Sequence, residues 1–439
     1  MKKRGIDSRL IVLIITLGFI LLIFIGLKVF CSPVFEKDSN RLVIYHWWTS
    51  SGEKMALNSL VEVFTQEYPE VIVALTPISG GAGYQMFDII KPLVRSGEAP
   101  DAFQMHAGYE AKPYYDAGLL EQVNYIWESE ELENVVPKIV QIMCQFDGNY
   151  YSVPIDIHRA NVVWYNKILL DEHNIDASDL TDWDSFFKAC DNLKANGVKY
   201  PIQIGKDWTV AHVFETIMAG EGIEFYEDWI NGKITSPDDP RLLNALEIFK
   251  KYVSYTNPDY TTLEWDIATS RIISGESAFN IMGDWANGEF KIAKKVYNED
   301  YGTFKVPNTN NMYGLVIDTF QHPKAIANPE NSDKWLKVVS SNKGQDAFNP
   351  IKGSISARVD TDVSKYDLYS RLAILDFISV RYMFPSVVHG SGAPEEFKIK
   401  FKEIMSDFVI NLNVTETAVE LTDYSKEISD KYTIGWDLD

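Results

Sequence analysis

Continuous apolar runs alternate with segments whose apolar residues recur every three or four positions along the chain. Residues 42–45 form an unbroken apolar run, which favours a strand buried on both faces of a parallel sheet. Apolar residues within 57–64 follow the i, i+3, i+4, i+7 spacing of one helix face, and this helix is predicted to end near Tyr68-Pro69. A second apolar run at 71–75 follows directly, so the pattern predicts a strand–helix–strand unit with short joints.

Similar alternation continues to about residue 167 and then gives way to helical patterns. The glycine loop SGGAG at 79–83 precedes a predicted helix to about Ser96, and a strand is expected at 102–105. Residues 147–167 predict a turn and two extended segments, which together are long enough to cross between domains. Helical spacing dominates afterwards, at 183–196, 212–219 and 240–256. The sequence therefore predicts an α/β protein with at least two domains built from non-contiguous pieces.

The N-terminal segment has the composition of an export signal or membrane anchor. Lys2, Lys3, Arg4 and Arg9 precede the uncharged stretch 10–27. Three outcomes stay open, namely an uncleaved anchor, a lipoprotein modified at Cys31 and a cleaved signal peptide. Phe30 stands where a lipoprotein cleavage site has a small residue, so the form of anchoring is unsettled. All three outcomes place the rest of the chain outside the cytoplasm, in a periplasm or on the outer face of the membrane.

The exported part is strongly acidic and carries few cysteines. The net charge of the chain is −21, and residues 1–30 contribute +4, which leaves −25 for the remainder. Such a charge disfavours nucleic acid and anionic lipid surfaces as partners. Apart from Cys31, its cysteines are Cys144 and Cys190, and both lie among helix-like residues, which predicts two buried thiols.

Aromatic and charged side chains gather at predicted strand ends and glycine turns. In open α/β sheets, ligands bind beyond the carboxyl ends of the strands, where such loops converge. The stretch HWWTSSGE places two indoles and a carboxylate at the end of the first strand, and other loops repeat this chemistry. The candidates are Trp47, Trp48, Glu53, Gln104, His106, Arg159, Trp208, Asp284, Trp285, Lys352 and His389.

These residue types match the needs of a sugar ring. A pyranose stacks its C–H face on an aromatic surface, and each of its hydroxyls both donates and accepts a hydrogen bond. Taken singly, each candidate has an ordinary structural explanation: the tryptophans as core residues, His106 as a hydrogen-bonded structural histidine, Asp284 as a helix cap, and Lys352 and Arg159 as surface cations. Their shared location is what favours a binding site.

Other chemistries find little support in the sequence. SGGAG lacks the Gly-Lys-Ser/Thr ending of a phosphate loop, and we interpret it as a flexible turn. His-Glu-x-x-His and Gly-x-Ser-x-Gly do not occur, and the seven histidines are scattered. We therefore expect neither a metal nor a cofactor.

Eight ordered motifs carry a resemblance to a known family. They are HWWTSSGE, GGAG, PDAFQMHAG, VPIDIHRANVVWYN, GKDWT, FNIMGDWA, GQDAFNPIKGSISAR and VVHGSGAPEEF. Over about residues 42–400 the chain resembles bacterial extracellular solute-binding proteins of ABC-type sugar importers, the maltose-binding-protein-like group, and most closely their glucose-binding branch. The resemblance implies two hinged α/β lobes of the type II periplasmic-binding-protein fold. It places residues 41–156 and 268–318 in the first lobe and residues 157–267 and 319–439 in the second.

The resemblance also implies a site and a function. The matched positions that would contact a monosaccharide are Trp47, Trp48, Glu53, Gln104, His106, Asp284, Lys352 and His389, with Trp208, Arg159 and Trp265 as neighbours. We expect a monomeric receptor for a glucose-like hexose, without a catalytic step, that delivers its ligand to ABC permease subunits in the membrane. Two alternatives remain: a glycoside hydrolase that uses two of Glu53, Asp156 and Asp284, and a sensor that presents sugar to a signalling partner.

Overall fold

The computed structural model describes residues 40–431. The predicted export segment, with the span 10–27 and Cys31, lies outside this range. Within it, no helix combines the length and the apolar character needed to cross a membrane.

The first lobe is built on a five-stranded sheet. The strand order is β2 (Ile72–Pro77), β1 (Arg41–His46), β3 (Ala102–His106), β12 (Asp318–Gln321) and β6 (Ser152–Pro154). β1 pairs in parallel with both β2 and β3, and helix α2 (Ser51–Glu67) connects β1 to β2. The predicted strand–helix–strand unit is therefore confirmed. Leu42 and Ile44 of β1 are fully buried, as an apolar central strand requires.

Helices cover this sheet and follow it along the chain. Helices α15 and α16 both pack against α2, although more than 260 residues separate them from it in sequence. A short hairpin of β4 (Gln145–Phe146) and β5 (Asn149–Tyr150) leads toward β6. The remaining elements of this lobe are α3 (Tyr84–Ser96), the 3₁₀ turn η1 (Tyr109–Ala111), α4 (Lys112–Asp116), α5 (Asn124–Ser129), α6 (Leu132–Val135), α7 (Lys138–Met143), α15 (Pro329–Ser340) and α16 (Asn342–Lys352).

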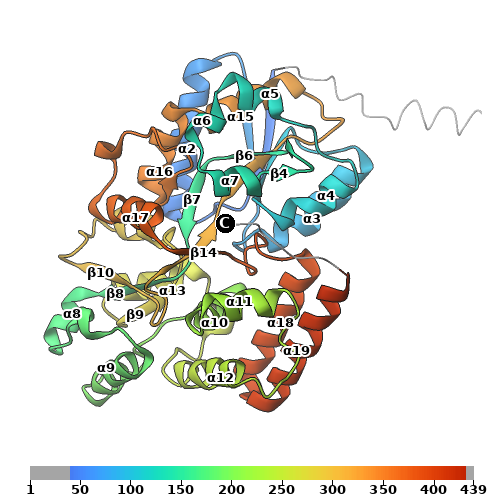
Figure 1. The fold of residues 1–439 in the computed structure, drawn as a ribbon. Coiled ribbons are helices and arrows are strands. Elements are labelled where there is room, and N and C mark those ends of the chain that lie inside the picture. The colour runs from blue at the N-terminus through green and yellow to red at the C-terminus, as the bar shows by residue number, and fades with distance from the viewer. Residues whose placement is uncertain (1–39, 432–439) are drawn as a thin grey trace, which may run out of the picture. The chain divides into compact units, whose positions relative to one another are not determined.

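The second lobe is mostly helical around a three-stranded sheet (Figure 1). Its strands pair in the order β10 (Tyr301–Lys305), β8 (Val162–Asn166) and β9 (Phe279–Ile281). Helix α10 (Trp208–Gly220) is buried along almost its whole length and packs against α12 and α18. The other helices are α8 (Lys167–Glu172), α9 (Trp183–Ala195), α11 (Ile223–Ile230), α12 (Pro240–Val253), α13 (Trp265–Ile273), α17 (Leu368–Ser379), α18 (Glu395–Asn411) and α19 (Val414–Lys431).

A four-stranded sheet joins the two lobes. Its order is β13 (Ile355–Ser356), β7 (Asp156–Arg159), β11 (Met312–Val316) and β14 (Tyr382–Pro385). β7 follows the first-lobe strand β6 and precedes the second-lobe strand β8 (Figure 1). β11 makes the return passage before β12. The predicted crossing within 147–167 is thus seen at β7. Helix α14 (Ala286–Ile292) touches α2 and α16 on one side and α13 on the other.

The strand pairing departs from the predicted lobe bounds in two places. Residues 268–318 were assigned to the first lobe, but β9 and β10 pair with β8. Residues 319–439 were assigned to the second lobe, yet β12, α15 and α16 pack on the first. The physical reason is that the chain returns to the first lobe at β11, and hydropathy patterns do not show which sheet a buried strand joins.

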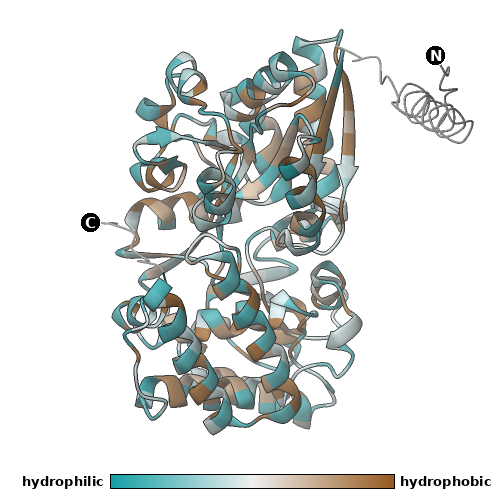
Figure 2. Cartoon of the chain, turned by 90° about the vertical axis from the view of Figure 1, so that its right-hand side faces the viewer, coloured by the Kyte–Doolittle hydropathy of each residue, from teal (hydrophilic) through white to brown (hydrophobic). Residues whose placement is uncertain are grey.

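Hydrophobic residues run along the strands of the first lobe and alternate with hydrophilic ones around the helices (Figure 2). The core includes Trp127, Trp164 and Trp335, each nearly or fully buried. Cys144 and Cys190 are free and buried, as the sequence predicts. Burial raises the pKa of both thiols.

Candidate functional site

A small cavity, with a free volume of about 20 Å³, lies where the loops of the two lobes meet. Both lobes and the joining sheet contribute to its wall, and four of the wall residues are tryptophans. Nearly all of these side chains are buried. The lining residues are Trp47, Glu53, Gly81, Ala82, His106, His158, Trp208, Trp265, Trp285, Val316, Asp318, Lys352 and His389.

Element ends place these residues on the wall. β1 and β3 are parallel neighbours, so Trp47, just after β1, and His106, at the end of β3, reach the same sheet edge. Their rings lie 4.7 Å apart between centroids. Glu53 stands in the first turn of α2, where it forms a capping box with Ser50. Trp208 and Trp265 begin α10 and α13, so helix starts complete the wall from the second lobe.

The structure brings most of the predicted candidates together. The cavity wall includes Trp47, Glu53, His106, Trp208, Trp265, Trp285, Lys352 and His389. These residues are separated by up to 342 positions in sequence, and strand ends and glycine turns nevertheless carry them to one place. Trp48, Gln104, Arg159 and Asp284 do not line the cavity.

Trp48 belongs to the core of the first lobe. Its side chain is fully buried, and its ring lies 4.7 Å from Phe348 and 5.7 Å from Phe320 between centroids. Successive residues of extended chain point to opposite sides, so one of two adjacent indoles faces inward when the other faces the cavity. The expectation that both indoles form the wall is therefore wrong for Trp48.

Gln104 and Asp284 lie behind the wall and hold wall residues in place. The Gln104 side chain accepts from the Trp47 backbone N–H at 3.1 Å and donates to Asp318 Oδ1 at 3.1 Å. The Asp284 carboxylate contacts His158 Nδ1 and accepts from the Arg159 backbone N–H at 3.0 Å. Asp284 therefore does not cap α14, which has no side-chain cap.

Arg159 points away from the cavity. Its guanidinium pairs with Asp376, donates to the Met312 carbonyl at 2.9 Å and lies 5.0 Å from the centre of the Tyr313 ring. Since β7 is a crossing strand whose side chains alternate, His158 faces the cavity and Arg159 faces the other side. Arg159 is a buried structural cation and not part of the wall.

Some wall residues were absent from the candidates. His158 lies on the crossing segment next to Arg159, and Asp318 is a charged residue inside the apolar stretch MYGLVIDTF, a signal that could have singled it out. Gly81 and Ala82 belong to SGGAG, which we interpreted only as a flexible turn. Their backbones take φ of 64° and 45°, and the Gly80 carbonyl accepts from Trp208 Nε1 at 3.2 Å. A side chain at Gly81 would come within 2.9 Å of that nitrogen, so this loop must remain small.

Carboxylates and imidazoles form a buried network at the base of the cavity. His158 Nε2 lies 3.1 Å from Asp156 Oδ2, and Asp318 Oδ2 lies 3.7 Å from the same nitrogen. Burial opposes a charged His158, but Asp156 and Asp284 outweigh it and raise its pKa well above the ordinary value. Burial alone would raise the pKa of Asp318, yet the nearby imidazoles of His158 and His106 bring it to about 2. His158 and Asp318 thus present a cation and an anion to the cavity.

His389 has the opposite electrostatic environment. Its ring packs against Trp208 and Trp285, with centroids 5.4 and 5.0 Å away, and its Nε2 lies 3.3 Å from His212 Nδ1. Burial, followed by repulsion from His106 and His212, holds the pKa of His389 well below its ordinary value. A neutral imidazole offers one donor and one acceptor, which suits a hydroxyl.

Lys352 and Glu53 form a buried ion pair on the wall. Nζ lies 3.4 Å from Glu53 Oε1, and both side chains are less than a tenth exposed. Glu53 Oε2 accepts from the backbone N–H groups of Thr49 and Ser50 at 3.0 and 3.1 Å. The carboxylate is therefore fixed in position, and the pair offers a donor and an acceptor in adjacent places.

One group of buried side chains has the composition of a cation site. Potential ligand atoms of Asp156, His158 and Asp318 lie within 4.8 Å of one another. The His158–Asp156 ion pair already occupies two of them. A raised pKa of His158 also opposes coordination, because a metal ligand must give up that proton.

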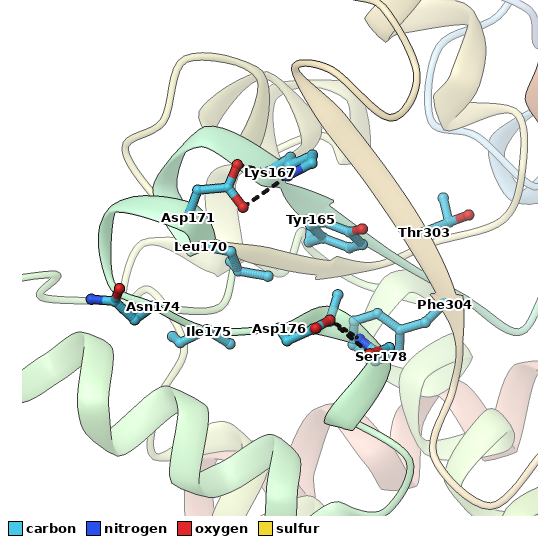
Figure 3. Close-up of a pocket in the computed structure, with 11 residues that line it drawn as sticks. Tyr165, Lys167, Leu170, Asp171, Asn174, Ile175, Asp176, Ser178, Thr303 and Phe304 are labelled. Atoms are coloured by element: carbon cyan, nitrogen blue, oxygen red, sulfur yellow. Dashed lines mark hydrogen bonds and ion pairs between the residues drawn. The ribbon is translucent and has the colours of Figure 1, made fainter.

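A wider pocket of about 570 Å³ lies elsewhere, between α8 and β10 of the second lobe (Figure 3). Tyr165 and Phe304 supply its aromatic surface, and Lys167 pairs with Asp171 beside it. The Asp171 side chain is exposed and that of Lys167 is about a third exposed, so this hollow lacks the buried partners of the cavity between the lobes.

The fold and the enclosed polar cavity define a two-lobed binding protein of the type II periplasmic class. A sequence profile described as bacterial extracellular solute-binding protein matches residues 48–346. The chain is 40% identical over 400 residues to an uncharacterized ABC transporter extracellular-binding protein of Pyrococcus horikoshii, covering 90% of each chain. It belongs to the bacterial extracellular solute-binding protein family.

More distant comparisons agree with this assignment. The glucose-binding protein GlcS of Saccharolobus solfataricus is 28% identical over 344 residues, which cover 73% of this chain and 61% of that protein. The solved structure of the bacterial solute receptor AcbH, which has an exclusive preference for β-D-galactopyranose, superposes with a TM-score of 0.77 over 89% of this chain and 99% of that one at 14% identity. The latter similarity concerns the fold alone.

Proposed function

We propose that this protein is a receptor for a monosaccharide of the glucose class, which it binds in the cavity between its lobes without chemical conversion. The observation that carries the proposal is the wall itself. It combines the indoles of Trp47, Trp208, Trp265 and Trp285 with fixed charged partners around one cavity. Indole faces suit the C–H side of a pyranose, and fixed donors and acceptors suit its hydroxyls.

The names of relatives, and not the cavity volume, favour a small sugar. The free volume of about 20 Å³ is far below the roughly 300 to 1,000 Å³ of ligand sites, so the wall must open further to hold a pyranose. One relative is named for glucose, and the structural neighbour described above for galactopyranose. Because the polar partners on the wall are buried, the cavity would reject a ligand that leaves them unpaired.

Two carboxylates of the hydrolase alternative do not face the cavity. Asp156 and Asp284 are fully buried and contact His158 from behind the wall. Glu53, the third, is neutralised by Lys352 and held by two backbone N–H groups. This arrangement favours binding over glycoside cleavage, which needs a carboxylate pair on either side of the scissile bond.

The proposed physiological role is delivery of the sugar to membrane permease subunits of an ABC importer. Related proteins carry names that place them in ABC transporters or in the periplasm. An acidic body exported by the N-terminal segment would meet its ligand outside the cytoplasm. We propose that a single copy binds one sugar, with closure of the lobes stabilised by the ligand's preference for the closed form.

Calorimetry on the purified protein tests the proposal. D-glucose, D-galactose, D-xylose, maltose and maltotriose would be titrated separately at matched ionic strength, and p-nitrophenyl glycosides of the same sugars would be assayed for released phenol. Saturable one-to-one binding of a monosaccharide without phenol release is expected. Phenol release with turnover would support the hydrolase, and binding restricted to maltotriose would contradict the monosaccharide class.

A further inference from the structure

A buried lysine of the second lobe reaches into the first. Lys398 stands in the first turn of α18 and is 2% exposed. Its Nζ donates to Glu110 Oε1 at 2.6 Å and to the Ala82 carbonyl at 3.1 Å. The same ammonium lies 4.3 Å from the centre of the Tyr84 ring. All three partners belong to the first lobe, so Lys398 spans the boundary between the lobes.

The partners of Lys398 connect directly to the cavity wall. Glu110 Oε2 accepts from the His106 backbone N–H at 2.7 Å and lies 2.8 Å from His106 Nδ1. Glu110 therefore fixes the orientation of the His106 ring, whose other nitrogen faces Asp318. Ala82 is itself a wall residue, held with φ of 45°. One ammonium group thus holds two pieces of the wall.

The charges involved have little access to water. Burial alone would raise the pKa of Glu110, but Lys398 and His106 outweigh it and hold the pKa below its ordinary value. Glu110 is therefore ionised opposite Lys398. Separation of the lobes would break this short charge-assisted contact and expose both groups to water. The pair therefore favours the closed arrangement, and it does so only while both charges are present.

A second contact between the lobes is weaker. Lys91 of α3 pairs with Glu395, the first residue of α18, but each side chain is about a quarter exposed. Ion pairs that keep access to water are screened and contribute less than buried ones. It follows that Lys398, and not Lys91, carries the electrostatic coupling at this edge.

We propose that Lys398 is a positioning residue of the binding site, which orders Ala82 and, through Glu110, His106, and which latches the lobes around the bound sugar. The inference rests on the proposed function, because it assigns a role in retaining that ligand. A lysine with a merely structural role would stabilise the fold without changing how long the ligand stays bound.

The test compares Lys398→Met with Lys400→Met. Methionine keeps the apolar stem against Tyr84 and removes the charge. Lys400 lies on the same helix, is about half exposed and forms an ion pair with Glu403 of that helix, so it provides a matched control. Stopped-flow tryptophan fluorescence would measure dissociation of D-glucose, or of the monosaccharide that calorimetry shows to bind most tightly. We expect dissociation to become about tenfold faster or more for Lys398→Met and to stay within about twofold for the control.

Two further variants keep the test decisive. Glu110→Gln approaches the same contact from the first lobe, and should accelerate dissociation even if Lys398→Met folds poorly. The sugar should dissociate from the double variant, Lys398→Met with Glu110→Gln, more slowly than the product of the two single effects predicts, because neither charge is then left without its partner. Lys398→Arg should recover part of the lost retention.

A measurement without sugar separates this inference from the proposed function. Small-angle X-ray scattering of the ligand-free proteins should show a larger radius of gyration for Lys398→Met than for wild type and Lys400→Met. If no monosaccharide binds wild type, the proposed function fails, and the scattering result still decides whether Lys398 holds the lobes together. If wild type binds sugar while folded Lys398→Met matches it in both dissociation rate and radius of gyration, the latch is refuted.

Discussion

The adjacent indoles Trp47 and Trp48 should give opposite results when each is changed. Trp47 lines the cavity, whereas Trp48 packs against Phe320 and Phe348 in the core. We expect Trp47→Ala to weaken sugar binding by the folded protein. Trp48→Phe should lower the free energy of unfolding and leave the dissociation constant of the folded protein nearly unchanged.

The magnitudes follow from area and packing. A pyranose would cover about a third of the roughly 200 Å² that an indole offers. At about 25 cal/mol per Å², the loss is about 1.6 kcal/mol, or roughly 15-fold in affinity. Replacing the Trp48 indole with a phenyl ring leaves a void in a close-packed core, which costs about 1–3 kcal/mol of unfolding free energy.

Calorimetry for the dissociation constant and urea unfolding for stability would be run on both variants and on wild type. The reasoning is refuted if Trp48→Phe weakens binding by tenfold while Trp47→Ala leaves it unchanged. It is also refuted if Trp47→Ala shows wild-type affinity, because the indole would then not contact the ligand.

Three other predictions concern charge and burial. Burial, with help from Lys54, lowers the pKa of His46 to about 4, so the unfolded chain takes up this proton first as the pH falls below about 6.5. Wild type should therefore lose about 1.4 kcal/mol of unfolding free energy per pH unit that His46→Leu does not lose. Urea unfolding at pH 7 and pH 5 measures this difference, and an equal pH dependence of the two proteins would contradict it. Lys352→Met removes the cation beside Glu53, so sugar affinity should fall about tenfold or more with an unchanged circular dichroism spectrum, and unaltered calorimetry would remove the pair from the site. Cys144 and Cys190 should resist a thiol reagent in the native protein and react after denaturation, and rapid native labelling of either would contradict their burial.

Much of the first lobe could be predicted because its signals are local. The unbroken apolar run before Trp47 and the helical spacing after Glu53 specify β1 and α2 without reference to distant segments. The lobe bounds could not be predicted in the same way, because the partner of a buried strand such as β9 depends on tertiary pairing and not on its own pattern.

The site could also be predicted only in part, because residue types indicate where it lies but not the direction in which each side chain points. Strand ends and glycine turns were sufficient to collect Trp47, His106 and His389 into one set, and the cavity contains them all. Whether a residue faces the cavity depends on a one-residue alternation, which separates Trp47 from Trp48 and His158 from Arg159. Sequence pattern finds the loop, but the pleat of the folded chain decides which neighbour reaches the ligand.

The most direct measurement is a crystal structure with the monosaccharide that calorimetry shows to bind most tightly. We predict one pyranose between the lobes, with a face against the indole of Trp47 or Trp285 and hydroxyls within hydrogen-bond distance of His389 and the Lys352–Glu53 pair. A sugar bound in the hollow beside Tyr165 and Phe304, and none bound between the lobes, would contradict this prediction.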